Sequence, residues 1–148
     1  MKNQLTELLT NYGDISCIWF DGHWDQTNPE GEKNRSSRID WKYNEIYGLI
    51  HKLQPQCMIG NNHHLDPIAG EDFQMFEQDL PGKNTAGLSF QEASALPLES
   101  CITMNDSWGF RITDHHYKTY NEVIHTLVGA AGRNTNLLLN VVQSALVK

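Results

Sequence analysis

Short apolar segments that end in polar clusters alternate along this chain with segments whose apolar residues recur at helical spacing. The first apolar segment, Ile15–Phe20, is rich in β-branched and aromatic residues, and it stops at Asp21 and Gly22. Such segments are typical of buried parallel strands, and in α/β proteins the loop beyond the carboxyl end of a strand carries the chemistry. Asp21 is therefore the first candidate for a functional residue, although Asp-Gly is also an ordinary turn sequence.

The remaining pattern predicts further strands and three helices. We expect strands over residues 15–20, 57–60, 71–79, 100–104 and 136–142. We expect helices over residues 5–12, from a cap at Ser36 or Ser37 to residue 53, and from a cap at Thr113 or Asp114 to Gly132. Strands that alternate with helices indicate parallel βα units.

Two architectures accommodate such units, an open doubly wound sheet and a (β/α)8 barrel. Only the open sheet closes properly in about 150 residues. Against it, no G-x-G-x-x-G or Walker A loop follows any predicted strand. Polar residues that cluster after at least three strands, including Asn61–His64, are what a barrel gathers into an active site.

Length and charge narrow the classes of protein. The 148 residues are enough for one domain, which we expect to run from residue 1 to 148. The 18 acidic and 11 basic residues give a net charge of -7, which argues against nucleic acid and anionic membranes as partners. No apolar run approaches the roughly 20 residues of a membrane span, and no targeting segment is evident, so the compartment is not predicted.

We interpret Cys17, Cys57 and Cys101 as buried structural thiols.

Carboxylates and tryptophans gather near the predicted strand ends. The carboxylates are Asp21, Glu71, Glu77 and Glu99, and the tryptophans are Trp19, Trp24 and Trp108. Glycoside cleavage uses a pair of carboxylates, one to attack or stabilise the anomeric centre and one to protonate the leaving oxygen. Aromatic faces pack on the C–H surfaces of the sugar. The composition of this edge therefore points to a carbohydrate as the ligand.

The histidine pairs are weak metal candidates, because no H-x-H or H-E-x-x-H accompanies them. We interpret His63 and His64, at a strand end, as hydrogen-bonding groups for a polyhydroxylated ligand. His115 and His116 are expected to open a helix as surface residues. We expect no metal site, and the absence of a G-x-S-x-G elbow sets serine catalysis aside.

Several segments in one order carry a family resemblance. They are Glu7–Gly13 followed by Ile18–Gly22, Gly70–Phe73, Glu99–Cys101 leading to Ser107–Phe110, and Asn136–Val141. With these segments the sequence resembles the α-L-fucosidases of glycoside hydrolase family 29. The similarity covers about Leu5 to Val141 and corresponds to the second half of that family's catalytic domain.

The resemblance implies a retaining exo-fucosidase with a (β/α)8-like barrel and an additional β-sandwich, acting on a fucosylated oligosaccharide or glycoconjugate. It implies Asp21 as the nucleophile and Glu77 as the acid/base, with Glu71 and Glu99 as alternatives. Trp19 and Trp24 match positions that line the fucose pocket, and Trp108 matches one near the sugar's methyl group. The reaction needs no metal or organic cofactor. Full-length members are expected to be secreted, periplasmic or lysosomal.

The chain departs from the family pattern before Met1 and after Val141. We therefore expect an α/β fold that is the second half of a (β/α)8 barrel, a fragment whose exposed sheet edges are liable to self-associate. One alternative is a non-catalytic carbohydrate-binding or subunit-like module that needs a partner half. Another is a small doubly wound α/β domain that shares only motifs with the fucosidases.

Overall fold

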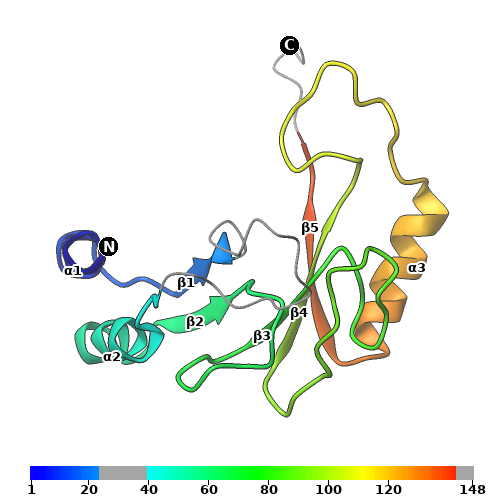
Figure 1. Cartoon of the computed structure of the whole chain (residues 1–148). Coiled ribbons are helices and arrows are strands. Elements are labelled where there is room, and N and C mark those ends of the chain that lie inside the picture. The colour runs from blue at the N-terminus through cyan, green and yellow to red at the C-terminus, as the bar shows by residue number, and fades with distance from the viewer. Residues whose placement is uncertain (24–39, 143–148) are drawn as a thin grey trace. The chain divides into compact units, whose positions relative to one another are not determined.

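The computed structural model of this chain describes residues 1–23 and 40–142. The chain divides into two compact units, Met1–Gln74 and Met75–Lys148. Figure 1 shows the elements in chain order: α1 (Lys2–Asn11), β1 (Cys17–Phe20), α2 (Tyr43–Leu53), β2 (Met58–Asn61), β3 (Gln74–Glu77), β4 (Leu98–Thr103), α3 (Tyr120–Ala131) and β5 (Thr135–Asn140).

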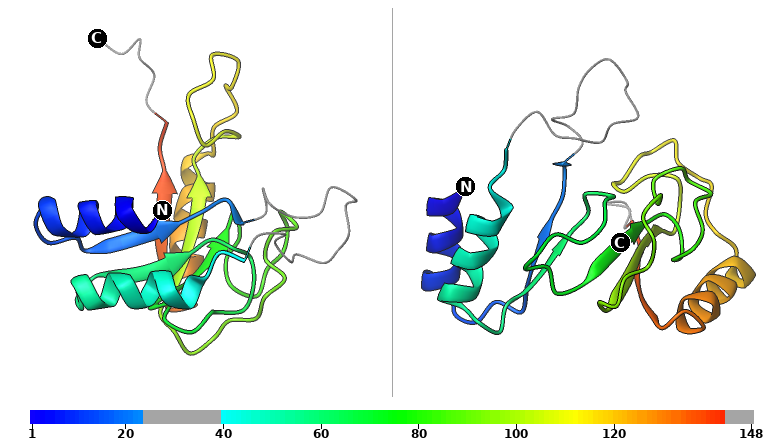
Figure 2. Two further views of the ribbon diagram at one scale, coloured as in Figure 1. Left: turned by 60° about the vertical axis from the view of Figure 1, so that its left-hand side comes forward. Right: turned by 60° about the horizontal axis from the view of Figure 1, so that its bottom comes forward.

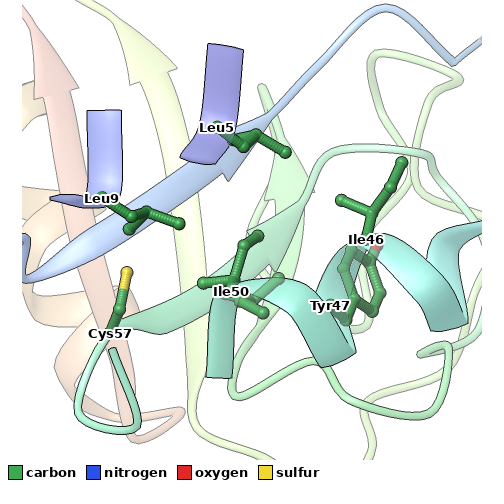
Figure 3. Close-up of a cluster of buried hydrophobic side chains, with 7 residues drawn as sticks. Leu5, Leu9, Ile46, Tyr47, Ile50 and Cys57 are labelled. Carbon is green, nitrogen blue, oxygen red and sulfur yellow. The ribbon is translucent and has the colours of Figure 1, made fainter. Parts of the chain in front are cut away.

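The first unit places two helices against a pair of parallel strands. β1 pairs with β2 in a register that joins Cys17 to Met58 and Phe20 to Asn61. Helices α1 and α2 lie side by side next to these strands (Figure 2). Their apolar faces form a core, drawn in Figure 3, that contains Leu5, Leu9, Ile46, Tyr47, Ile50, Cys57 and Ile59.

Side chains alternate across β1 as the pleat requires. Ile18 and Phe20 pack against the helical core. Trp19 lies between them in sequence, so its side chain points to the face away from the helices, and it is 37% exposed. Its partner in the register is Gly60, which has no side chain to cover the indole ring.

The ends of both helices in this unit follow from local sequence. Gly13, with φ of 78°, supplies the left-handed turn after α1. Gln54 ends α2 in an extended conformation because Pro55 follows it. The Gln54 amide then joins the end of α2 to α1 and to the connection that leads to β1: Nε2 donates to the carbonyls of Leu9 and Gly13, and Oε1 accepts from the N–H of Ile15.

The second unit contains a sheet of order β3-β4-β5. β4 and β5 are parallel over six residue pairs, from Leu98 with Thr135 to Thr103 with Asn140. Helix α3 precedes β5, and its Ala130 is buried with Leu80, Ile102 and the partly buried Leu137. The last residue of each strand, Thr103 and Asn140, therefore lies at one common edge of this pair.

The predicted start of the third helix is wrong. The helix begins at Tyr120, and Thr119 caps it in a capping box with Glu122. Asp114 was predicted as a cap, but its Oδ2 accepts from Asn105 Nδ2 at 2.6 Å and from the Ser107 N–H at 2.9 Å. Asp114 therefore stabilises the loop after β4 instead of a helix. His115 and His116 precede the helix and do not open it.

The other predicted elements are present, and their observed ends differ from the predicted ones by a few residues. All five predicted strands are present, although β3 is shorter than residues 71–79. α2 begins at Tyr43, whereas the predicted caps Ser36 and Ser37 lie outside the described residues. Cys57 and Cys101 are buried as predicted, whereas Cys17, also predicted to be buried, is only half-buried. The α/β class with parallel strands is confirmed, and no helix in residues 1–23 and 40–142 is long and apolar enough to cross a membrane.

Candidate functional site

Asp21 is the first residue beyond β1, at the carboxyl end of the β1–β2 pair. The N–H of Asn62 donates to the carbonyl of Phe20 at 2.9 Å, which extends the ladder by one step past β2. Asn62 Nδ2 also donates to Asp21 Oδ1 at 3.2 Å. Asn62 is 2% exposed, so the exposed Asp21 carboxylate has a buried amide as its neighbour. Gly22 follows with φ of 84°, and it turns the chain away from the strand.

A second carboxylate, Glu71, is buried beside the same strand end. Its Oε1 accepts from the Tyr47 hydroxyl at 2.9 Å and lies 2.9 Å from His63 Nε2. Its Oε2 accepts from the Ile68 N–H at 3.1 Å. Three donors therefore surround the two oxygens of Glu71. Its side chain is 1% exposed and that of His63 is 3% exposed.

The tautomer of His63 follows from its neighbours. The Leu65 N–H donates to His63 Nδ1 at 3.0 Å, so Nδ1 is an acceptor and carries no proton. The proton of the neutral ring is then on Nε2, which donates to Glu71. Both ring nitrogens of His63 are thus bonded inside the first unit. The sequence predicted a ligand contact for this residue, and the structure places it among protein partners.

Two tyrosines and a second histidine complete this polar cluster. Asn61 Nδ2 donates to the Tyr47 hydroxyl at 2.8 Å, and burial raises the pKa of Tyr47 above its ordinary value of 10.0. His23 Nδ1 lies 2.9 Å from the Tyr43 hydroxyl, and burial raises the pKa of Tyr43. The rings of His23 and His63 meet edge to face at 6.2 Å. The cluster therefore keeps its tyrosines protonated as hydrogen-bond donors.

Sequence reasoning missed three members of this cluster. Tyr47 has the helical spacing of the apolar residues around it, and nothing in that spacing distinguishes a hydroxyl that binds a buried carboxylate. Tyr43 has the same helical spacing and gives no other signal. His23 follows Asp21 and Gly22 directly, so its proximity to the nucleophile candidate was the available signal.

Glu77 and Trp108 belong to the second unit. Glu77 is the last residue of β3 and is 9% exposed. Gln78, directly after it, donates its N–H to the carbonyl of Cys101 and its Nε2 to Thr103 Oγ1, so the end of β3 lies beside the end of β4. Trp108 is 43% exposed, and Asn140 Nδ2 donates to its carbonyl at 2.7 Å. Both residues thus lie near the carboxyl ends of strands.

Glu99 lies elsewhere. It is the second residue of β4, and its Oε2 accepts from Asn136 Nδ2 at 2.8 Å, near the start of β5. This position is at the amino edge of the β4–β5 pair, opposite the edge that carries Thr103 and Asn140. Trp24 lies outside the described residues. Within residues 1–23 and 40–142, no three His, Cys, Asp or Glu side chains converge as a metal site would require.

The family model for Alpha-L-fucosidase matches residues 1–146. The chain belongs to the α-L-fucosidase family. Among curated proteins it is 26% identical over 161 residues to "Alpha-L-fucosidase 1" of Arabidopsis thaliana, covering 94% of this chain and 29% of that protein. It is 25% identical over 154 residues to "Putative alpha-L-fucosidase 1" of Oryza sativa subsp. japonica, covering 93% of this chain and 28% of that protein.

Solved fucosidase structures share the fold over nearly the whole chain. Alpha-L-fucosidase isoenzyme 1 from Paenibacillus thiaminolyticus is 36% identical with a TM-score of 0.69, covering 98% of this chain and 33% of that one. The fucosidase AlfC from Lactobacillus casei, in complex with its α-L-fucose product, is 26% identical with a TM-score of 0.66. That match covers 94% of this chain and 36% of AlfC. The chain therefore spans about a third of the length of these relatives.

Proposed function

We propose that this chain takes part in the hydrolysis of terminal α-L-fucosyl linkages and that Asp21 is the nucleophile. The observation that carries the proposal is the position of Asp21, at the carboxyl end of β1 with Asn62 Nδ2 donating to one oxygen. In parallel α/β folds, this end of a strand is where catalytic groups are placed. Membership of the α-L-fucosidase family supplies the substrate class.

The proposed mechanism is a double displacement. Asp21 attacks the anomeric carbon while Glu77 protonates the departing glycosidic oxygen, and a covalent fucosyl-enzyme forms. Glu77 then removes a proton from water, which attacks the same carbon and releases fucose with retained configuration. Because Asn62 Nδ2 donates to Oδ1 of Asp21, we propose that the other oxygen, Oδ2, is the one that attacks.

Glu77 is preferred to the other two carboxylates as the acid/base. Glu77 ends β3 at the edge where its neighbour Gln78 meets Thr103. Glu71 accepts three hydrogen bonds from within the first unit, so a role in proton transfer would break a buried network. Glu99 lies at the amino edge of its strand pair, away from the expected site.

The proposed sugar pocket is lined by Trp19, Trp24 and Trp108. Trp19 supports this assignment because its ring faces away from the helical core opposite a glycine. An exposed indole in that position can stack on the C–H face of a sugar. For His63, whose nitrogens are both engaged, we propose that it contributes by holding the loop after β2 in place beneath the ligand.

The substrate tested first is 4-nitrophenyl α-L-fucopyranoside, which is bound in the structure of an aspartate-to-alanine variant of AlfC. AlfC is also solved with the disaccharide Fuca(1,6)GlcNAc, so a fucosylated glycoconjugate is the proposed natural class of ligand. Because the chain spans about a third of its relatives, we expect the wild-type chain to release 4-nitrophenol slowly at best, and we expect Asp21→Ala to lower any such rate at least about a thousandfold, as loss of a nucleophile does. Asp14→Ala, at an exposed position before β1, is the matched control and retains the wild-type rate.

A covalent step is checked separately by intact-protein mass after incubation with a 2-deoxy-2-fluoro fucosyl donor. The wild-type chain should gain one fluorofucosyl group on Asp21, and Asp21→Ala should gain none. If the wild-type chain neither releases 4-nitrophenol nor becomes labelled but binds fucose, the chain is a carbohydrate-binding module and the catalytic proposal fails. Hydrolysis that survives in Asp21→Ala would reject the nucleophile assignment alone.

We also infer that copies of this chain associate through sheet edges. In the described residues β5 has one hydrogen-bonded neighbour, β4, and so does β1, whose neighbour is β2. Strands with one free edge can add a strand from another chain. Sedimentation velocity over a range of protein concentrations should show a rising weight-average mass. A mass that stays monomeric at every concentration would reject this inference.

A further inference from the structure

The connection between β3 and β4 forms one wall of a cavity in the second unit. Residues 78–97 contain no helix or strand, and part of this connection, together with Leu98 and Arg133, surrounds a cavity of about 620 Å³. Small-molecule sites in proteins usually have volumes of about 300–1,000 Å³. The cavity is therefore large enough for one sugar unit.

The cavity lies at the end of the sheet opposite to the proposed catalytic edge of this unit. Leu98, on its wall, is the first residue of β4 and pairs with Thr135, the first residue of β5. Thr103 and Asn140 are the last residues of the same strands. Five steps of about 3.3 Å, or about 16 Å, separate the two ends. A ligand in the cavity is thus a ligand of a second site, and its binding does not depend on the proposed hydrolysis.

Arg133 gives the cavity a fixed positive charge. Its Nε donates to the carbonyl of Pro81 at 3.1 Å, and its Nη1 donates to the carbonyl of Gly129 at 3.0 Å. These two bonds hold the guanidinium group in place and leave further N–H groups for a ligand. Among the described residues, no carboxylate forms an ion pair with Arg133.

The charges on the wall favour an anion. Among the described residues that line the cavity, Lys83 and Arg133 are the cations and Glu92 is the carboxylate, which gives these residues one net positive charge. The whole chain has a net charge of -7, which makes a locally positive wall unusual for this protein. A guanidinium group matches the geometry of a carboxylate or a sulfate. A single excess charge suits a ligand with one anionic group and does not suit a polyanion such as nucleic acid.

The other wall residues suit the body of a sugar. Phe90 is 65% exposed, and an aromatic ring exposed to this extent can pack on C–H groups. Ser89 is 6% exposed and its hydroxyl has no hydrogen-bond partner. Gln91 donates from Nε2 to the carbonyl of Met75, whereas its buried Oε1 has no partner. A sugar hydroxyl group can both donate and accept, so small side-chain rotations would let it satisfy these two atoms.

We propose that this cavity binds a sugar unit that carries one carboxylate or sulfate group. Its anionic group is held by Arg133 and Lys83, its C–H face by Phe90, and its hydroxyl groups by Ser89 and Gln91. Through this site the chain contacts an acidic glycan at a place separate from the fucosyl linkage. The same glycan could then be held at two points, which raises its local concentration at the proposed active site.

The test uses the whole chain, isotope-labelled for NMR, titrated with glucuronate, with glucose and with sodium sulfate. We expect saturable shifts of the Arg133 Nε–H and of the amides of residues 83–92 with glucuronate, at least about tenfold tighter than any shifts with glucose. Lys83→Gln should weaken the binding of both glucuronate and sulfate. Phe90→Ala should weaken the binding of glucuronate and leave that of sulfate unchanged, because sulfate has no C–H face. Lys52→Gln, an exposed lysine on α2, is the control and should change neither.

Each contrary outcome overturns the proposal. Equal affinity for glucose and glucuronate would show that the cations do not contribute to binding. Sulfate binding without tighter glucuronate binding would leave an anion site and reject the sugar. Shifts confined to other residues, or no saturation at millimolar ligand, would reject the site itself. Because the readout is binding at residues 83–92 and Arg133, a failed fucosidase assay leaves this result unaffected.

Discussion

His63 Nε2 lies 2.9 Å from Glu71 Oε1, and both side chains are buried in the first unit. The Leu65 N–H fixes the proton of the ring on Nε2, so the histidine donates and the carboxylate accepts. The bond joins the loop that follows β2 to the segment that leads to β3. Asn62, which donates to Asp21, is in the same loop. The buried pair therefore supports the residue that orients the proposed nucleophile.

The first prediction concerns the acceptor role of Glu71. Glu71→Gln replaces one oxygen by an amide that donates, so at least one of the three present donors loses its acceptor. We expect a loss of about 1–3 kcal/mol in the free energy of unfolding, the cost of an unsatisfied buried polar group. Urea unfolding measures it, with Glu7→Gln on the exposed face of α1 as the control. Equal stability of the two variants would show that the network is not structural.

The second prediction concerns the turn before Glu71. Gly70 has φ of 99°, and an added Cβ would lie 3.2 Å from Cβ and from Cδ2 of Tyr47. Tyr47 is 1% exposed and cannot move aside. We expect Gly70→Ala to destabilise the chain by about 1–3 kcal/mol. In contrast Gly48→Ala, inside α2 with no atom within 4 Å of the added Cβ, should stabilise it by about 0.5–1 kcal/mol. Thermal unfolding of both variants checks the sign of each change.

The third prediction concerns the start of α3. Thr119→Ala removes the capping box with Glu122 and should cost about 1 kcal/mol. Thr113→Ala, at the cap that the sequence suggested, should change stability by less than about 0.5 kcal/mol. Urea unfolding at pH 7 compares the two variants with the wild type. A larger loss for Thr113→Ala would contradict the observed helix boundary.

The same capping box has a pH signature. The hydrogen bond from Thr119 holds the pKa of Glu122 below its ordinary value of 4.5. A carboxylate with a lowered pKa stabilises the folded state above that value and loses the contribution as the pH falls through the folded pKa. The stability difference between wild type and Thr119→Ala should therefore shrink when unfolding is measured below pH 4.5. A difference that stays constant down to pH 3 would contradict a charge-assisted cap.

The fourth prediction concerns the Tyr47 hydroxyl group. Tyr47→Phe leaves Asn61 and Glu71 without one partner each and should cost about 1–3 kcal/mol at neutral pH. Burial raises the pKa of Tyr47, so its neutral form stabilises the folded state below about pH 10, and this stability is lost as the pH rises further. Between pH 9 and 11, the free energy of unfolding should fall more steeply for the wild type than for Tyr47→Phe. Tyr12→Phe, at a residue that is 66% exposed, should keep the wild-type slope.

The residues of the proposed site that directly follow a strand were predictable from the sequence. The apolar run before Asp21 predicted a strand, and β1 ends at Phe20, one residue before the carboxylate. The cluster Asn61–His64 was predicted after the next strand, and Asn62 does meet Asp21 there. The different environments of Glu71, Glu77 and Glu99 were not predictable, because each lies near a strand and none has a distinctive local pattern.

The sequence by itself determined the order of the elements, because hydrophobic periodicity and the positions of Gly13, Pro55 and Gly132 act over a few residues. It also determined the family, since several motifs occur in one order. Only the tertiary structure decided which polar groups meet. Glu71 accepts from Tyr47, which is 24 residues away, and Arg133 bonds to Pro81, which is 52 residues away. Such pairs depend on how strands and helices pack, and local sequence patterns do not specify contacts between residues that are far apart in the chain.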